Sequence, residues 1–159
     1  MAQQKGSAQP SDKTVCVNRQ ARHNYFVEET YEAGLVLLGS EVKSLREGKA
    51  NLKDSYARIQ RGEAFLVNTH ISPYPGANQF NHDPTRTRKL LLHQREIERL
   101  TGKTKERGLT LVPLRLYFKN GKAKVELGLA RGKKLYDKRE TLRKKVAARE
   151  VERSLKGRH

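Results

Sequence analysis

The sequence is short of several residue types, and each shortage excludes a class of structure. The one cysteine, Cys16, can form neither an intramolecular disulfide nor a two-cysteine zinc or redox motif. There is no tryptophan, no long apolar run and no amphipathic basic helix with large aromatic residues, so we expect no membrane binding. Residues 1–14 lack the apolar stretch of a secretory signal. These absences predict a reduced, cytoplasmic protein.

Acidic residues are also scarce relative to basic ones. The 159 residues include 34 Lys and Arg against 17 Asp and Glu, which gives a formal charge of +17. Self-repulsion on this scale opposes a compact free state unless a polyanion neutralises it. Nucleic acid is therefore the first partner to consider.

Composition divides the chain into three parts. Residues 1–14 are polar and predict a disordered N-terminal arm, because they cannot bury enough apolar surface to offset the entropy of ordering. Residues 15–130 predict one β-rich RNA-binding domain, since short alternating apolar runs recur between Gly, Asn and Pro. Residues 131–159 form a basic C-terminal tail with twelve basic and four acidic side chains, a charge of +8.

Several strands and two short helices can be predicted in the central domain. Residues 111–118 and 123–129 form a hairpin around Asn120-Gly121, a pair that favours a type I′ turn. A second hairpin is predicted over 55–60 and 64–71, and a strand over 31–38. About five such strands favour a small closed barrel over an open sheet with exposed edges. Helices are predicted over 41–47, with Ser40 as N-cap, and over 93–100, before Gly102.

The tail has high helix propensity over residues 137–155, which contain no Gly or Pro. Its apolar residues do not form one stripe: Leu142 and Val146 lie together, and Val151 and Leu155 lie on roughly the opposite side. Such a helix has little reason to dock on its own domain. We expect the tail to be disordered when free and helical when bound to RNA.

No pattern in the sequence indicates an enzyme. The phosphate-loop, zinc-helix and nucleophile-elbow motifs are missing, and the five histidines lack metal-ligand spacing. We therefore expect no catalytic residue, no metal and no cofactor. A nuclease stays formally open, because Asp54, Asp83 and some glutamates could converge around Mg²⁺.

Three clusters mix basic residues with rings or amides. In residues 18–26, Arg19 and Arg22 could grip phosphates while His23 offers a face for an unstacked base; the equal alternative is solvated arginines beside a strand. In residues 83–92, three cations, including Lys89, precede an apolar triplet that would anchor them to the core as a binding segment; the alternative is a solvated loop. Residues 41–49 could be a self-paired helix surface, with Lys43 and Glu47 four residues apart.

The ordered motifs of residues 15–140 resemble those of the SmpB, or SsrA-binding protein, family. The resemblance is carried by these runs: Asn18-x-x-Ala21-Arg22-His23, Tyr31-Glu32-Ala33-Gly34, Gly39-Ser40-Glu41-Val42-Lys43-Ser44-Leu45-Arg46, Asp83-Pro84-Thr85-Arg86-Thr87-Arg88-Lys89-Leu90-Leu91-Leu92 and Gly132-Lys133-Lys134-x-x-Asp137-Lys138-Arg139. It implies a mainly β, OB-fold-like closed antiparallel barrel with flanking short helices. One departure is His93, where some relatives have Asn.

The resemblance also implies a function. Family members bind the tRNA-like domain of tmRNA (SsrA RNA) and deliver it, charged and with elongation factor Tu, to stalled ribosomes for trans-translation. The tail senses the empty mRNA channel near the decoding centre of the small subunit, where it contacts rRNA. A general ribosomal or initiation-factor-like RNA-binding protein is the alternative, which composition alone ranks equally.

Residue roles follow from the matching motifs. The resemblance places Glu32, Leu91 and Lys124 at positions used for tmRNA binding, with Asn18, Arg19 and Arg22 on an adjoining surface and His23 facing the decoding centre. Lys89, from the second basic cluster, joins the predicted RNA-binding set. The mRNA-channel role falls to the motif at the start of the tail, namely Gly132, Lys133, Lys134, Asp137, Lys138 and Arg139.

Overall fold

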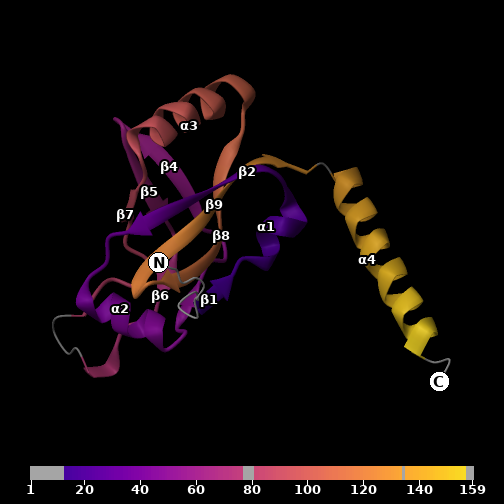
Figure 1. Ribbon diagram of the computed structural model, residues 1–159, viewed down its shortest axis with the longest axis horizontal. Helices are drawn as coiled ribbons and strands as arrows, with labels where there is room; N and C mark the ends of the chain where they lie inside the picture. Colours follow the sequence, from indigo (N-terminus) through magenta and orange to yellow (C-terminus); the bar gives the residue numbers. More distant parts are fainter. Residues whose placement is uncertain (1–12, 77–80, 134, 157–159) are drawn as a thin grey trace, which may run out of the picture.

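The computed structural model describes residues 13–76, 81–133 and 135–156 of the chain (Figure 1). The expected N-terminal arm lies outside these residues, except for its last two positions. The strands are β1 Lys13–Val17, β2 Tyr25–Leu35, β3 Ala50–Asn51, β4 Tyr56–Gln60, β5 Glu63–Val67, β6 His70–Ile71, β7 Arg88–Leu91, β8 Thr110–Lys119 and β9 Lys122–Gly132. The helices are α1 Arg19–Asn24, α2 Gly39–Arg46, α3 Gln94–Arg107 and α4 Leu135–Lys156.

The main sheet is antiparallel and has the strand order β1-β8-β4-β5-β7-β2-β9. β8 also pairs with β9, so hydrogen-bonded neighbours run from β8 through β4, β5, β7, β2 and β9 and return to β8. The short strands β3 and β6 pair separately. The molecule is therefore mainly β, as the sequence predicts.

The core lies among these strands and is dominated by leucine. Leu66, Leu127 and Leu129 are fully buried, and Leu45 of α2 and Leu100 of α3 belong to the same cluster. In Figure 1, α3 and α2 lie at opposite ends of the sheet. Each helix therefore closes one end of the core with an apolar side chain.

The β8–β9 hairpin confirms the prediction of a type I′ turn. Asn120 and Gly121 have φ values of 52° and 77°, so both central residues take the positive angles that this turn needs. Val125 and Leu127 are fully buried, whereas Lys124 lies on the outer face. Alternation along one strand therefore separates the core from the surface.

Other predicted boundaries need correction. β1 begins at Lys13, within the expected arm, and pairs with β8. The second predicted hairpin is interrupted: β5 ends at Val67, and β6 pairs with β3 instead. β9 continues to Gly132, two residues into the expected tail, because its last residues pair with the start of β2.

The predicted helix starts and ends also differ from the structure. Ser40 lies inside α2 and bonds the His82 ring (2.8 Å); the N-cap is Leu38, whose backbone N–H donates to the Glu41 carboxylate (2.8 Å). α3 continues through Gly102 and ends at Gly108, which has the left-handed φ of 64°. A cap with positive φ, rather than any glycine, ends the helix.

The tail contains a helix where the sequence has high helix propensity; the expected change from disorder to helix on binding RNA stays a prediction. α4 covers Leu135–Lys156, against the predicted 137–155. It projects away from the sheet in Figure 1, and Leu142, Val146, Val151 and Leu155 are each about half exposed or more. As expected from the missing apolar stripe, this helix is not part of the core.

Candidate nucleic-acid interface

Three of the predicted residues come together where β2, β7 and β9 pair. Gly34 of β2 lies opposite Leu91 of β7 and Lys124 of β9. Glu32 shares the outer face of β2 with Gly34, because side chains two residues apart point to the same side. We call this set, Glu32, Gly34, Leu91 and Lys124, the Gly34 surface. Gly34, Leu91 and Lys124 line one groove, in which Leu91 is 54% exposed.

Gly34 allows the close approach on which this surface depends. A β-carbon at position 34 would lie 3.3 Å from the Leu91 β-carbon. That is tighter than ordinary van der Waals contact, so any larger residue would push β7 or the Leu91 side chain aside. The absence of a side chain at Gly34 therefore leaves the Leu91 methyl groups and the Lys124 stem accessible in one groove.

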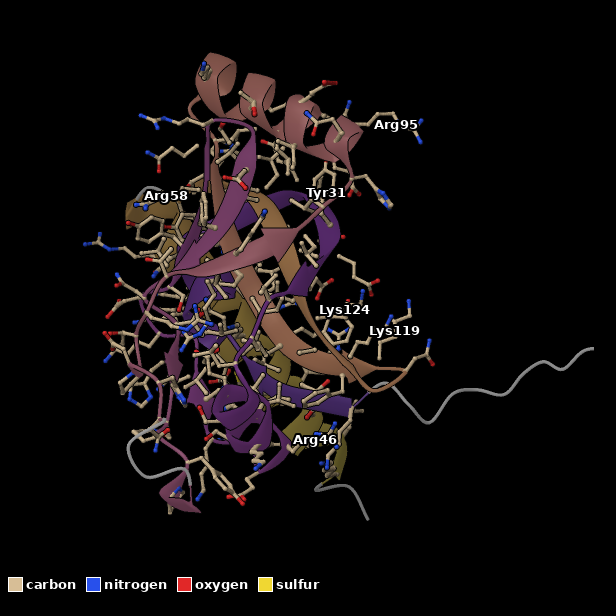
Figure 2. All side chains as sticks on the ribbon, turned by 90° about the vertical axis from the view of Figure 1, so that its left-hand side faces the viewer. Tyr31, Arg46, Arg58, Arg95, Lys119 and Lys124 are labelled. Carbon is tan, nitrogen blue, oxygen red and sulfur yellow. The ribbon has the colours of Figure 1, made fainter. Side chains whose placement is uncertain are left out.

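Glu32 is held in place by two residues of β8. The Tyr117 hydroxyl donates to Glu32 Oε2 at 2.5 Å, and Lys119 Nζ lies 3.5 Å from the same oxygen. The Tyr117 bond, with the positive charges of Lys119 and Lys124, lowers the pKa of Glu32 despite partial burial. Figure 2 shows Lys119 and Lys124 close together on this edge. An ionised, oriented carboxylate can accept hydrogen bonds from ribose hydroxyls or base amino groups.

Tyr117 itself is fixed by a second contact. The Arg115 guanidinium lies 4.0 Å from the centre of the Tyr117 ring and pairs with Glu126 at 3.1 Å. Burial and the bond to Glu32 raise the pKa of Tyr117, so its hydroxyl stays protonated. The predicted site residues did not include Tyr117 or Lys119. The predicted Asn120-Gly121 turn was a usable signal, because it fixes Tyr117 opposite Lys124.

Lys89 lies beside this surface. In β7, Arg88 and Leu90 are buried while Lys89 and Leu91 are exposed, so Lys89 shares the outer face of Leu91. Its ammonium pairs with Glu63 of β5 at 2.8 Å, where both side chains are about half exposed. An exposed pair of this kind is weak enough for a phosphate to compete with it.

The other two cations of the second basic cluster point inward. Arg88 is fully buried, and its guanidinium donates to Glu41 Oε2 and to the Thr69 carbonyl, each at 2.7 Å. Arg86 donates to both oxygens of Glu41, at 2.9 and 2.7 Å. The cluster is therefore neither a three-cation phosphate grip nor a solvated loop. Lys43 and Glu47, whose pairing was one interpretation of the third cluster, have other partners: the Tyr74 ring and Lys49.

The remaining predicted residues of the N-terminal cluster lie on α1, a helix that the sequence analysis did not predict. Asn18 is 7% exposed; its side chain accepts from the Ala21 N–H at 3.1 Å and donates to the Pro113 carbonyl at 2.9 Å. These bonds attach α1 to β8. Arg19 and Arg22 are exposed and His23 is half-buried. Asn18 therefore holds α1 against β8, and Arg19 and Arg22 lie exposed on that helix.

The start of the tail lies beside α1. Gly132 pairs with Tyr25 at the end of the β2–β9 ladder. The Lys133 backbone N–H donates to the Asn24 carbonyl at 2.8 Å, and its ammonium to the Arg22 carbonyl at 3.2 Å. Arg139 is exposed on α4. Lys134 and the side chains of Asp137 and Lys138, all predicted for the mRNA channel, lie outside the described residues. We call Arg19, Arg22, His23, Gly132 and Lys133 the α1 surface.

The two surfaces lie at opposite ends of one ladder. Gly34 pairs with Lys124 at one end, and Tyr25 pairs with Gly132 at the other. At about 3.3 Å per residue, eight residues of β9 separate the two surfaces by about 26 Å. A protein of this shape can contact two separate parts of an RNA assembly at once.

Two other kinds of feature, a metal site and a membrane-crossing helix, are absent from the residues that the structure describes. Over 13–76, 81–133 and 135–156, no three His, Cys, Asp or Glu side chains are grouped as ligands for a metal ion. Within the same ranges, the length and apolar content that a membrane-crossing helix needs do not occur together in any helix.

Fold and surfaces together define a small, basic β-sheet protein with a C-terminal helix projecting from its sheet. The SmpB protein family matches residues 15–157, and the chain belongs to that family. An SsrA-binding protein from Desulforudis audaxviator is 65% identical over 150 residues, covering 94% of this chain and 98% of that protein. One from Geobacillus thermodenitrificans is 64% identical, covering 92% and 94%.

A solved structure agrees with these relatives. A chain from the structure described as "tmRNA-SmpB: a journey to the center of the bacterial ribosome" is 56% identical. It aligns with a TM-score of 0.64 over 76% of this chain and 85% of its own length. At this identity and TM-score, the similarity covers both sequence and fold.

Proposed function

We propose that this chain binds the tRNA-like domain of tmRNA and delivers it to stalled ribosomes for trans-translation. The observation that carries the proposal is its similarity, over nearly the whole length, to proteins named SsrA-binding protein. The formal charge of +17 supports an RNA partner, since phosphates relieve the repulsion among its cations. The activity is binding, and it involves no catalytic residue.

The Gly34 surface is the proposed tmRNA site. Lys124 and Lys89 would neutralise phosphates, Leu91 would pack against a ribose or base, and the Glu32 carboxylate would accept hydrogen bonds from RNA donors. The position of Leu91 and Lys124 in one groove, beside the strand that carries Glu32, supports this assignment. We further propose that the ring of paired strands is a closed barrel of the OB type, which presents these side chains on its outer face.

The α1 surface and the tail are the proposed ribosome-facing part. His23 would face the decoding centre, with Arg19 and Arg22 on adjacent RNA and Asn18 fixing the helix that carries them. The tail, from Gly132, Lys133 and Lys134 through Asp137, Lys138 and Arg139, would enter the empty mRNA channel, whose rRNA walls suit its charge of +8. Bound message would block the same channel, so occupancy by the tail would report stalling.

The proposal includes partners and a place of action. Charged tmRNA would arrive with elongation factor Tu, as it does for an aminoacyl-tRNA, and the complex would act on the ribosome in the cytoplasm. The tail would be disordered before binding and fully helical in the channel, because phosphates offset the repulsion among its cations.

A truncation tests the proposed division of labour. Ending the chain after Lys133 keeps β9 and its pairing with β2 intact. We expect such a chain to bind tmRNA nearly as tightly as the full chain, measured by filter binding. It should fail to support tagging of nascent chains on ribosomes stalled without downstream message.

The matched control is Lys124→Ala in the full chain, which should lose tmRNA affinity and tagging together. If the truncated chain lost as much tmRNA affinity as Lys124→Ala, that result would contradict the separation of the two surfaces. Unchanged tagging by the truncated chain would contradict the role of the tail.

A further inference from the structure

A polar cleft lies between α1 and the turn that precedes β4, apart from the Gly34 surface. Its volume is about 340 Å³, at the lower end of the range for small-ligand sites. The tyrosines Tyr25 and Tyr56 line it, with Gln20 and Asp54. Tyr56 is 39% exposed, so its ring is available to a ligand.

A second hollow adjoins the first and shares Asn18 and Gln20 with it. Arg19 and Lys53 line this second hollow, and both are exposed cations. An aromatic, hydrogen-bonding compartment therefore lies next to a cationic one. This is the chemistry of a single nucleotide, whose base is flat and whose phosphate is negative.

Four polar side chains around the two hollows are not used within the fold. Across the part of the chain that the structure describes, the side chains of Arg19, Gln20, Lys53 and Asp54 make no hydrogen bond or ion pair. This contrasts with two cations near the Gly34 surface, Lys89 and Lys119, which are paired with glutamates. Unpaired side chains that line the two adjoining hollows can contact a ligand without breaking bonds within the protein.

The backbone holds Asp54 in an unusual conformation. Its φ is 61°, in the left-handed region that few residues other than glycine adopt, although Asp tolerates it better than most. Asn51 stabilises the turn by accepting a hydrogen bond from the Lys53 N–H at 2.7 Å. The turn therefore fixes the backbone of Asp54, which lines the cleft.

We propose that this cleft binds one unstacked RNA nucleotide, with a preference for guanine. The base would stack on the Tyr56 ring, and its phosphate would lie between Arg19 and Lys53. Guanine offers two adjacent hydrogen-bond donors, N1–H and the 2-amino group. The two oxygens of the Asp54 carboxylate can accept one hydrogen bond from each. The proposal rests on the proposed function, because it adds a base-reading site to an RNA-binding chain, and the RNA is either tmRNA or ribosomal RNA.

Variants of the full chain test the site against both RNA sources. Tyr56→Ala removes the stacking ring and should lower affinity about 5- to 100-fold for whichever RNA supplies the base. Tyr56→Phe keeps the ring and should bind normally. Asp54→Asn removes the charge, and Asn tolerates the same φ, so it should also weaken binding. Its matched control is Asp83→Asn, the same change in an exposed turn elsewhere, which should have no effect.

Equilibrium binding to a tmRNA transcript and to purified small ribosomal subunits identifies the source. If Tyr56→Ala lowers the affinity for only one of the two RNAs, the bound nucleotide belongs to that RNA. Normal affinity of Tyr56→Ala for both probes would overturn the site. If the unaltered chain did not bind the tmRNA transcript, the proposed function would fail instead. Thermal unfolding of each variant checks that the fold is kept.

Nuclear magnetic resonance tests the base preference directly. Titrating the full chain with guanosine monophosphate should give saturable shifts at the amides of Gln20, Asp54 and Tyr56. Inosine monophosphate lacks the 2-amino group and should bind more weakly, and Asp54→Asn should remove the difference. Equal shifts with both nucleotides, or none in the cleft, would refute guanine recognition by Asp54.

Discussion

At the scale of single residues, Glu41 is the buried charge around which several segments meet. Its carboxylate is fully buried and accepts hydrogen bonds from Arg86, Arg88 and the Leu38 backbone. Arg88 is equally buried and also bonds the Thr69 carbonyl, at 2.7 Å. One carboxylate therefore joins the start of α2 to β7 and the segment before it.

Glu41→Gln should destabilise the fold strongly, because it leaves the Arg88 guanidinium buried with no counter-ion. Breaking one partner of a buried pair costs about 3–5 kcal/mol. Chemical denaturation of the full chain measures the change. Glu47→Gln is the matched control: Glu47 forms an exposed pair with Lys49, and its loss should cost at most about 0.5 kcal/mol. Similar costs for both variants would contradict a structural role for the buried pair.

The same residue gives stability a dependence on pH. Burial tends to raise the pKa of Glu41, but hydrogen bonds from Arg86, Leu38 and Arg88 outweigh it and lower that pKa below 4.5. The contribution of Glu41 is thus fully present above the ordinary value and is lost as pH falls through the lowered one. In Glu41→Gln, this part of the acid dependence of the free energy of unfolding should be missing.

Glu32 and Tyr117 form the corresponding pair on the proposed tmRNA surface. Tyr117→Phe removes the hydroxyl that orients the Glu32 carboxylate, and the pKa of Glu32 should rise toward 4.5. Since Glu32 is partly exposed, we expect the binding free energy for tmRNA to weaken by about 1 kcal/mol, which is about a fivefold loss of affinity. Filter binding measures the affinity, and nuclear magnetic resonance titration measures the pKa.

Tyr31→Phe is the control for this change. It also removes a tyrosine hydroxyl bonded to a glutamate, Glu29, at 2.5 Å, but that pair lies against Arg99 of α3. Its tmRNA affinity should stay normal. A similar loss in both variants would mean that Tyr117 has no specific role in orienting Glu32.

At the scale of secondary-structure elements, the two glycines of α3 have opposite roles. Gly102 lies inside the helix, where a β-carbon would meet no atom within 4 Å. Gly108 ends the helix with a φ of 64°. Gly102 is therefore a weak point in the helix, whereas Gly108 is needed for its end.

Alanine at each position should change stability in opposite directions. Gly102→Ala should stabilise the protein by about 0.5–1 kcal/mol, because alanine has the better helix propensity. Gly108→Ala should destabilise it by about 1–2 kcal/mol, the cost of left-handed backbone for an L-residue. Thermal or chemical unfolding measures both. Destabilisation by Gly102→Ala would contradict an uninterrupted α3.

Local signals were sufficient for some elements and not for others. Asn120-Gly121 predicted the β8–β9 hairpin because a type I′ turn depends on its own two central residues. The six-residue α1 was missed, since so short a helix is stabilised mainly by packing of Ala21 against β8 and by the Asn18 bond to Pro113. The sequence predicts a helix that ends before Gly102, but only the backbone angle distinguishes Gly102 from Gly108.

At the scale of the whole molecule, charge and shape act together. The chain carries +17, of which the tail contributes +8, and several acidic residues of the domain position cations. Glu32 and Glu63 hold lysines at the outer face, and Glu41 neutralises arginines inside. The β2–β9 ladder holds the Gly34 surface and the α1 surface about 26 Å apart. The charge of the tail is therefore carried largely by a helix that projects from the sheet, and Arg19, Arg22 and Lys133 place three further cations on the α1 surface.

The sequence by itself determined the charge, the β-rich class, the hairpin turn, the helical tail and the family, because these depend on composition, local backbone preference or ordered motifs. Only the tertiary structure decided which cations are available. Arg86, Arg88 and Lys89 are near neighbours in the sequence, but two point inward to Glu41 and one outward. The direction of the two arginines depends on a partner 45 or more residues away, and that partner is set by strand pairing and core packing.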